Sequence, residues 1–312
     1  MIGLGGAGGY FGGLLVEAGK DVTFVARGDH YRTIREKGLT VRCVRGDFHI
    51  EKPELIDSIR KIEDPELVLI FVKTYHTMQV TRELSTVVSD RTAIVTFQTG
   101  LENDHQIKQI IPANMVYPGF AFINSSKPEP GLIEQISGPC TLTFGDRSKT
   151  PNEVLNKVEL LLKEGGIDAT LSDDIERDMW VKLVWIATFS GMTSIYRSRV
   201  GPILNNKEGC RIFTQCLDEA FAIADAMEIS IPDETRKKIY GKIKYYKSEG
   251  ANAKTSLLLD IENNRRTEIE TLQGSLVRYA RETGVAAPIM NLIYNIISLY
   301  DTKVSDGPAG SL

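Results

Sequence analysis

The feature that most constrains this chain is a glycine-rich run near its start, Gly3-Leu4-Gly5-Gly6-Ala7-Gly8-Gly9. It fits the pattern G-x-G-x-x-G, in which the first glycine allows a tight turn, the second lets backbone N–H groups approach a pyrophosphate, and the third lets a helix pack closely on a sheet. An anion bound there would lie at the positive end of a helix dipole. The run therefore predicts a dinucleotide-binding loop formed by Gly3, Gly5, Gly6, Gly8 and Gly9.

The sequence around the glycines supplies most of the context that such a loop requires. An apolar helix pattern follows and ends at Gly19, and residues 22–26 are typical of a strand. A strand before the loop should contribute about five apolar residues, whereas only Met1 and Ile2 precede the glycines. We interpret the short start as a start site set too far downstream or a truncated sequence; a glycine-rich tail without a ligand is the alternative.

Length and composition indicate an ordinary globular protein of more than one domain. A chain of 312 residues exceeds what one core usually organises, and domains of about 150 residues are expected. Apolar and charged contents of 42% and 25% are typical of soluble proteins. A net charge of −4 without a long basic run argues against nucleic acid as a partner.

Cysteine and histidine usage gives no sign of a metal site. The four cysteines are widely scattered and form no C-x-x-C pair, and the four histidines show no i, i+4 spacing. We therefore expect no metal and no disulfide framework. The chain shows neither a signal-peptide pattern nor an uninterrupted apolar stretch of membrane-spanning length. We expect a cytoplasmic protein without a membrane partner, and the sequence leaves homodimerisation open.

Two nearly continuous apolar runs, residues 66–73 and 92–97, are typical of strands in a parallel sheet that is covered on both faces. The carboxyl ends of such strands face the crevice where ligands bind. Lys73 ends the first run, and Gln98 and Thr99 follow the second. We predict cofactor contacts at these three residues. The structural alternatives are a plain strand-end lysine and a loop that leads into a helix.

Arg27 stands at the end of the predicted strand 22–26, where dinucleotide-binding folds contact the adenosine ribose of the cofactor. A carboxylate there favours NAD, whereas an arginine suits the 2′-phosphate of NADP through charge-assisted hydrogen bonds. Arg27 therefore predicts NADPH as the cofactor. A solvated surface arginine is the alternative, and Asp29 lies close enough in sequence to contact a ribose instead.

The strand signal disappears after residue 171, and helical patterns occupy most of the remainder. The sequence therefore predicts an α/β protein: an N-terminal Rossmann-type dinucleotide-binding domain, residues 1–170, followed by an all-helical C-terminal domain, residues 171–312. We expect the active site in the cleft between them. The expected helices of the second domain are residues 174–197, 206–228, 233–248, 255–283 and 288–301.

Lys182 is the only charge in the apolar stretch from Met179 to Met192. Lysine is seldom fully buried without a partner, and burial lowers its pKa toward the range that suits a proton donor. A lysine that extends its ammonium group to solvent from the helix flank is the alternative. Glu268 and Glu270 flank a later apolar stripe and offer partners, and Ser256 adds a hydroxyl upstream.

The chain resembles the ketopantoate reductase (2-dehydropantoate 2-reductase) family over essentially its whole length. The resemblance is carried by the glycine run, Val25-Ala26-Arg27-Gly28, Val72-Lys73, Gly100-Leu101-Glu102-Asn103, Trp180-x-Lys182-Leu183, and Thr267-Glu268-Ile269 with Gly274. It implies NADPH-dependent reduction of a 2-keto acid. By position it further implies that Lys182 is the general acid, that Glu268 contacts cofactor or substrate, that Ser256 contacts substrate, and that Arg27 and Lys73 contact the cofactor.

The chain departs from the family pattern at three positions of the expected substrate site. Thr99 stands where family members usually have Asn, and Ile186 and Ser190 replace two further Asn residues that follow the catalytic lysine by four and eight positions. Because residues four apart share a helix face, the substrate face has lost two amides. We therefore weigh ketopantoate against a less polar 2-keto acid, and against a non-catalytic NADP-binding sensor.

Overall fold

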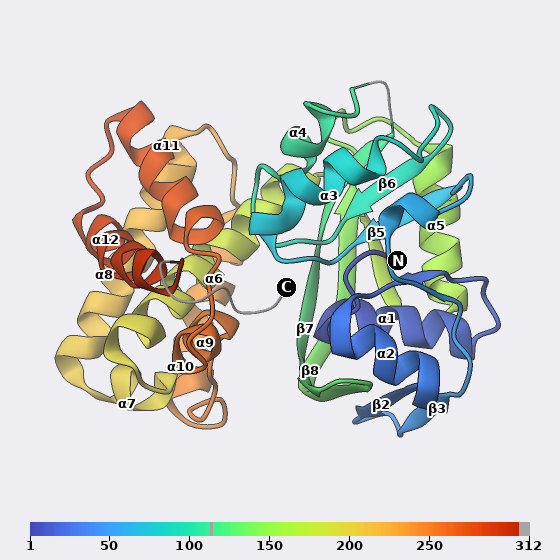
Figure 1. Cartoon of the computed structure of the whole chain (residues 1–312). Coiled ribbons are helices and arrows are strands. Elements are labelled where there is room, and N and C mark those ends of the chain that lie inside the picture. The colour runs from blue at the N-terminus through green and yellow to red at the C-terminus, as the bar shows by residue number, and fades with distance from the viewer. Residues whose placement is uncertain (113–114, 306–312) are drawn as a thin grey trace. The chain divides into compact units, whose positions relative to one another are not determined.

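The computed structural model describes residues 1–112 and 115–305. The chain divides into two compact units, Met1–Ile175 and a second unit that begins at Glu176 (Figure 1). The first contains strands and helices, and the described part of the second is helical throughout. The predicted class, a Rossmann-type α/β domain followed by a helical domain, is confirmed. The first unit includes all of β9, and so extends a few residues past the expected boundary.

The first unit is organised by a twisted, mainly parallel sheet. Its strands are β1 (Phe24–Val25), β2 (Leu39–Cys43), β3 (Phe48–Ile50), β4 (Leu55–Ile56), β5 (Leu67–Ile70), β6 (Ala93–Thr96), β7 (Val116–Glu129), β8 (Leu132–Gly145) and β9 (Asp168–Ser172).

Ile2 takes the place of the first strand of this sheet. It forms parallel bridges to Val25 on one side and to Ile70 on the other, with N–H donated to Leu69 O at 2.9 Å and its own carbonyl accepting from Phe71 N at 2.8 Å. The resulting order is β4, β1, Ile2, β5, β6, β7. This is the doubly wound order of dinucleotide-binding domains, whose direction reverses between Ile2 and β5.

Strands β7 and β8 form one long antiparallel hairpin that continues well beyond the apolar segments 115–123 and 140–144. The polar residues Asn124, Ser125, Ser126 and Glu129 also pair with β8, so the connecting turn is reduced to Pro130-Gly131. Backbone hydrogen bonds therefore extend both strands into segments whose polar residues do not predict a strand. The shorter antiparallel hairpin of β2 and β3 encloses Arg45-Gly46-Asp47, residues that are typical of a tight turn.

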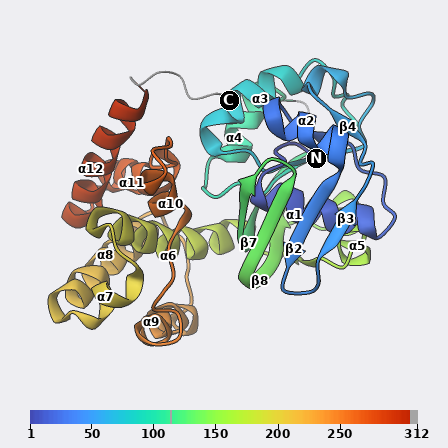
Figure 2. The same ribbon diagram turned by 60° about the horizontal axis from the view of Figure 1, so that its bottom comes forward.

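Helices cover both faces of the sheet (Figure 2). They are α1 (Gly6–Glu17), α2 (Gly28–Lys37), α3 (Thr77–Leu84), α4 (Asn103–Lys108) and α5 (Glu153–Glu164), with short 3₁₀ turns η1 (Ile59–Lys61) and η2 (Thr74–His76). One core joins α1 and α5 through buried residues such as Phe11 and Leu155. A second core joins α3 and α4 to β5 and β6 through residues such as Val80 and Ile107.

The second unit consists of α6 (Ile175–Tyr196), α7 (Val200–Asn205), α8 (Lys207–Ala226), α9 (Asp233–Lys247), α10 (Ser256–Glu262), the π-helical turn η3 (Glu270–Gly274), α11 (Ser275–Thr283) and α12 (Pro288–Ser305). The prediction of one helix over residues 255–283 is wrong. The helix ends at Glu262, and Asn264 has a φ of 56°, which a continuing right-handed helix excludes. Glu268 therefore lies just before a new helical segment.

Within the described ranges, no helix is long and apolar enough to cross a membrane. The same residues contain no group of three His, Cys, Asp or Glu side chains placed to hold a metal ion. All four cysteines are free thiols.

Candidate cofactor and catalytic sites

The glycine loop lies at the reversal point of the sheet and requires its glycines for distinct reasons. Gly3 has a φ of 99°, and a Cβ there would lie 2.7 Å from Val72 N. A Cβ on Gly8 would lie 2.1 Å from Gly3 O. A Cβ on Gly5, in contrast, would meet nothing within 4 Å. The first and third glycines of the pattern are thus needed by the fold itself, while the second borders open space.

The start of α1 fits a pyrophosphate. Gly5 is its N-cap, no side chain caps the first turn, and the first turn contains no acidic residue. The first N–H groups of a helix lack intrahelical partners and carry the positive end of the dipole, which favours a bound anion. Gly6 and Gly9 are closely covered from within the unit, by Ser125 and Ile133 respectively. They support the loop by close packing.

Arg27 is the N-cap residue of α2 and is already in an ion pair. Its Nη2 lies 2.5 Å from Oε2 of Glu83, in the last turn of α3. Glu83 is the more buried of the two, with 18% of its side chain exposed against 42% for Arg27. Asp29, the alternative ribose contact, is exposed and pairs with Arg32. The carboxylate that accompanies Arg27 comes from a helix more than fifty residues away in sequence.

Lys73 follows β5 and is the N-cap of η2, a half-buried position at the carboxyl end of the strand next to Ile2. Gln98 is 4% exposed, and its amide N–H groups donate to Val72 O and to Thr77 Oγ1, both at 2.9 Å. Its Oε1 accepts from Thr96 Oγ1 at 2.8 Å. Because the Gln98 side chain is committed to the protein, it orders the segment that carries Lys73.

Thr99 is half-buried, and its carbonyl accepts from the Asn103 amide at 3.2 Å. Gly100 follows with a φ of 128°, which restricts that position to glycine. An ion pair that the sequence pattern did not predict holds this loop: Arg147 binds the fully buried Asp104 through two contacts of 2.8 and 3.0 Å and donates to Leu101 O at 2.6 Å. In the sequence, Arg147 lies 43 positions after Asp104, and no local pattern connects the two residues.

Lys182 lies in the middle of α6 and is half-buried. Burial of its ammonium group lowers the pKa of Lys182 to about 7, and attraction to the Glu268 carboxylate opposes part of that shift. A lysine with such a pKa exists in both protonation states near neutral pH and can donate its proton. The structure thus brings Lys182 and Glu268 into electrostatic contact, as the sequence suggested.

The backbone around Glu268 is fixed by its neighbour Thr267. Both the N–H and the hydroxyl of Thr267 donate to the Asp301 carboxylate of α12, each at 2.9 Å. Directly after Glu268 the chain enters the π-turn, with Gly274 N donating to Ile269 O at 2.8 Å. π-turns occur often at functional sites. Here the π-turn and the hydrogen bonds of Thr267 to Asp301 fix the backbone on both sides of Glu268, and so fix the direction of its side chain.

Ile186 and Ser190 occupy the helix face of Lys182, one and two turns on. Ile186 keeps partial exposure, whereas Ser190 is 1% exposed. The buried Gln273 of η3 donates to Ser190 Oγ at 3.1 Å and to Ala187 O at 2.7 Å. Ser190 therefore contacts the π-turn, and the partly exposed side chain one turn after Lys182 is the alkyl group of Ile186.

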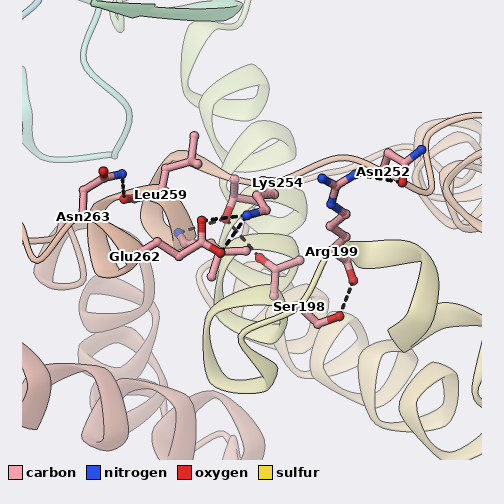
Figure 3. Close-up of polar contacts among 10 residues, drawn as sticks. Ser198, Arg199, Asn252, Lys254, Leu259, Glu262 and Asn263 are labelled. Atoms are coloured by element: carbon pink, nitrogen blue, oxygen red, sulfur yellow. Dashed lines mark hydrogen bonds and ion pairs between the residues drawn. The ribbon is translucent and has the colours of Figure 1, made fainter. Parts of the chain in front are cut away.

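Ser256 is the exposed first residue of α10, and Thr255 caps that helix by accepting from Leu258 N. Thr255 also shares a hydrogen bond of 3.0 Å with Thr193 of α6. Next to Thr255 in the sequence, Lys254 forms an ion pair with Glu262, and Arg199 donates a hydrogen bond to Asn252 (Figure 3). The Thr255–Thr193 hydrogen bond holds the start of α10 against α6, so Ser256 is presented from an ordered position.

Family models match both units. Residues 1–149 match "Ketopantoate reductase PanE/ApbA", and residues 174–301 match "Ketopantoate reductase PanE/ApbA C terminal". Among similar proteins, an uncharacterized oxidoreductase of Bacillus subtilis is 26% identical over 97% of this chain and 98% of its own length. A 2-dehydropantoate 2-reductase of Nostoc is also 26% identical, over 98% of this chain and 96% of its own.

Solved structures share the fold of the whole chain. The 2-dehydropantoate 2-reductase of Geobacter metallireducens has a TM-score of 0.89 at 26% identity and covers 96% of this chain and 98% of its own. A D-mandelate dehydrogenase bound to NADH and anilino(oxo)acetate has a TM-score of 0.87 at 19% identity, with coverages of 97% and 98%. The second similarity is one of fold.

Proposed function

Because the chain belongs to the ketopantoate reductase family, a family of oxidoreductases that reduce 2-keto acids, we propose that it reduces the ketone of 2-dehydropantoate to pantoate with NADPH. The observation that carries the proposal is Lys182, whose pKa is lowered to about 7 by burial beside Glu268. A non-catalytic NADP-binding sensor would need neither residue.

Lys182 acts as the general acid in this proposal. Reduction of a ketone builds negative charge on the carbonyl oxygen, and a positioned ammonium group stabilises that charge and then protonates the oxygen. The Glu268 carboxylate favours the charged form of Lys182, so the ammonium group keeps the proton that it is to donate. Thr267, anchored on Asp301, holds Glu268 in place for this task.

The glycine loop binds the cofactor pyrophosphate at the start of α1, and bound NADPH supplies the hydride. Lys73 lies at the neighbouring strand end and contacts the cofactor phosphates or ribose, while the loop at Thr99 borders the nicotinamide end and the substrate. Arg27 binds the 2′-phosphate. Gln98 serves by ordering the Lys73 segment, since its side-chain N–H groups are already donated to Val72 and Thr77.

A less polar 2-keto acid is the second candidate substrate, and the environment of α6 favours it. Ile186 offers no hydrogen bond, and Ser190 is directed to Gln273. A hydroxylated substrate would leave its hydroxyl without a partner on this face, and a site discriminates against polar groups that it cannot satisfy.

Ser256, exposed at the start of α10, is the residue that we propose to bind the 4-hydroxyl of 2-dehydropantoate.

The test compares 2-dehydropantoate with its matched analogue 3,3-dimethyl-2-oxobutanoate, which lacks only the 4-hydroxyl, by following NADPH absorbance. We expect a higher kcat/KM for 2-dehydropantoate and loss of that advantage in Ser256→Ala. A higher value for the analogue would assign the enzyme to less polar 2-keto acids. Absence of turnover with any 2-keto acid, despite tight NADPH binding, would contradict catalysis and favour the sensor.

A further inference from the structure

The Arg27–Glu83 ion pair is partly exposed, because the Arg27 side chain is 42% exposed and the Glu83 side chain is 18% exposed. It joins the N-cap of α2 to the last turn of α3 at 2.5 Å, with the arginine well exposed. Exposed ion pairs contribute little to stability. The pair lies, however, at the end of β1, where dinucleotide-binding folds distinguish the two nicotinamide cofactors.

Both chemical groups that make this distinction are present here, and they touch. An arginine at this position binds a 2′-phosphate, and a carboxylate accepts a hydrogen bond from a free 2′-hydroxyl. The carboxylate usually follows the second strand, but Arg27 occupies that position in this chain. Glu83 supplies a carboxylate to the same place from α3.

We propose that Glu83 is a cofactor-specificity residue, which weakens the preference for NADPH that Arg27 creates and makes the protein competent to bind NADH. This inference rests on the proposed function, because it assumes that the cofactor lies along the carboxyl ends of the strands.

Glu83 acts on the two cofactors in opposite directions. Toward NADPH, its charge repels the 2′-phosphate, which carries close to two negative charges, and its Oε2 occupies a guanidinium N–H that the phosphate would use. Toward NADH, the carboxylate accepts from the 2′-hydroxyl while it remains paired with Arg27. The Gln79 amide donates to the other oxygen, Oε1, at 3.3 Å and orients the group.

The experiment measures dissociation constants of NADPH and NADH by the fluorescence of the reduced cofactors, without substrate, for the unmodified protein and Glu83→Gln. We expect Glu83→Gln to bind NADPH at least about tenfold more tightly and NADH more weakly. The matched control is Glu164→Gln, which removes a carboxylate from the ion pair with Lys20 elsewhere in the same unit and should leave both constants unchanged.

A double variant separates Glu83 from Arg27. In Arg27→Ala the 2′-phosphate has lost its partner, and adding Glu83→Gln should still tighten NADPH binding, because the repulsion does not pass through the arginine. An unchanged ratio of the two constants in Glu83→Gln would overturn the assignment of Glu83 and leave the proposed function intact. Failure of both cofactors to bind the unmodified protein would overturn both.

Discussion

Replacing Lys182 by Met should make the protein more stable while nearly abolishing its activity. The pKa of Lys182 falls from 10.5 to about 7 on folding. Since each pKa unit corresponds to about 1.36 kcal/mol, burial of this charge costs the folded state about 2–4 kcal/mol at neutral pH. Met has a similar length and no charge, so the variant should recover that free energy.

The pH dependence of stability identifies the cause. Between pH 7 and 10.5 the unfolded chain retains the Lys182 proton and the folded protein has lost it. The free energy of unfolding of the original protein should therefore rise with pH across this window. Lys182→Met lacks that contribution, so its advantage should be greatest below pH 7 and vanish above 10.5.

Urea denaturation across this pH range measures the stability effect, and NADPH oxidation with the best 2-keto acid measures turnover. We expect kcat to fall by about 10²–10⁴-fold, as for loss of a general acid, with the NADPH dissociation constant unchanged. The control is Lys238→Met, at an exposed position of α9, which should alter neither quantity. Turnover within a few fold of the original, or a variant less stable at neutral pH, would refute the reasoning.

Three further changes test individual contacts. Glu268→Gln removes the carboxylate that raises the pKa of Lys182, so the upper limb of the kcat/KM profile should move below pH 7; an upward movement would contradict their coupling. Arg147→Met leaves the Asp104 charge buried and unpaired, and urea denaturation should show a loss of about 3–5 kcal/mol. Burial lowers the pKa of His30 to about 4, so the unfolding free energy should drop by up to about 3 kcal/mol as pH falls from 6.5 to 4. His30→Asn, which retains an acceptor near the Gly131 N–H that bonds to His30, should remove that drop; a drop of equal size in the variant would assign it to other groups.

The sequence was sufficient for features that depend on residue type and short spacing. The glycine loop could be identified because the backbone geometry of Gly3 and the close packing of Gly8 admit no other residue. Lys182 stood out because a lone charge in an apolar helix needs an environment that accommodates it. The hairpin of β2 and β3 encloses Arg45-Gly46-Asp47, whose residue types by themselves favour a tight turn. In each case the signal lies in residue types and spacings within a short stretch of sequence.

Tertiary structure decided which groups meet. Glu83 reaches Arg27, Gln273 engages Ser190, and Asp104 is buried against Arg147 across separations that no local pattern encodes. The length of β7 and β8 depends on backbone hydrogen bonds between the two strands. The polar side chains in these segments give no strand signal in the sequence.

The helix break before Glu268 was missed because the apolar stripes on its two sides were joined into one helix, although residues 262–268 include no apolar residue and Asn264 adopts a left-handed conformation. Composition and spacing therefore determined the kind of chemistry, whereas the environment of each acid, base and anion contact depends on atoms that only the folded chain brings into range.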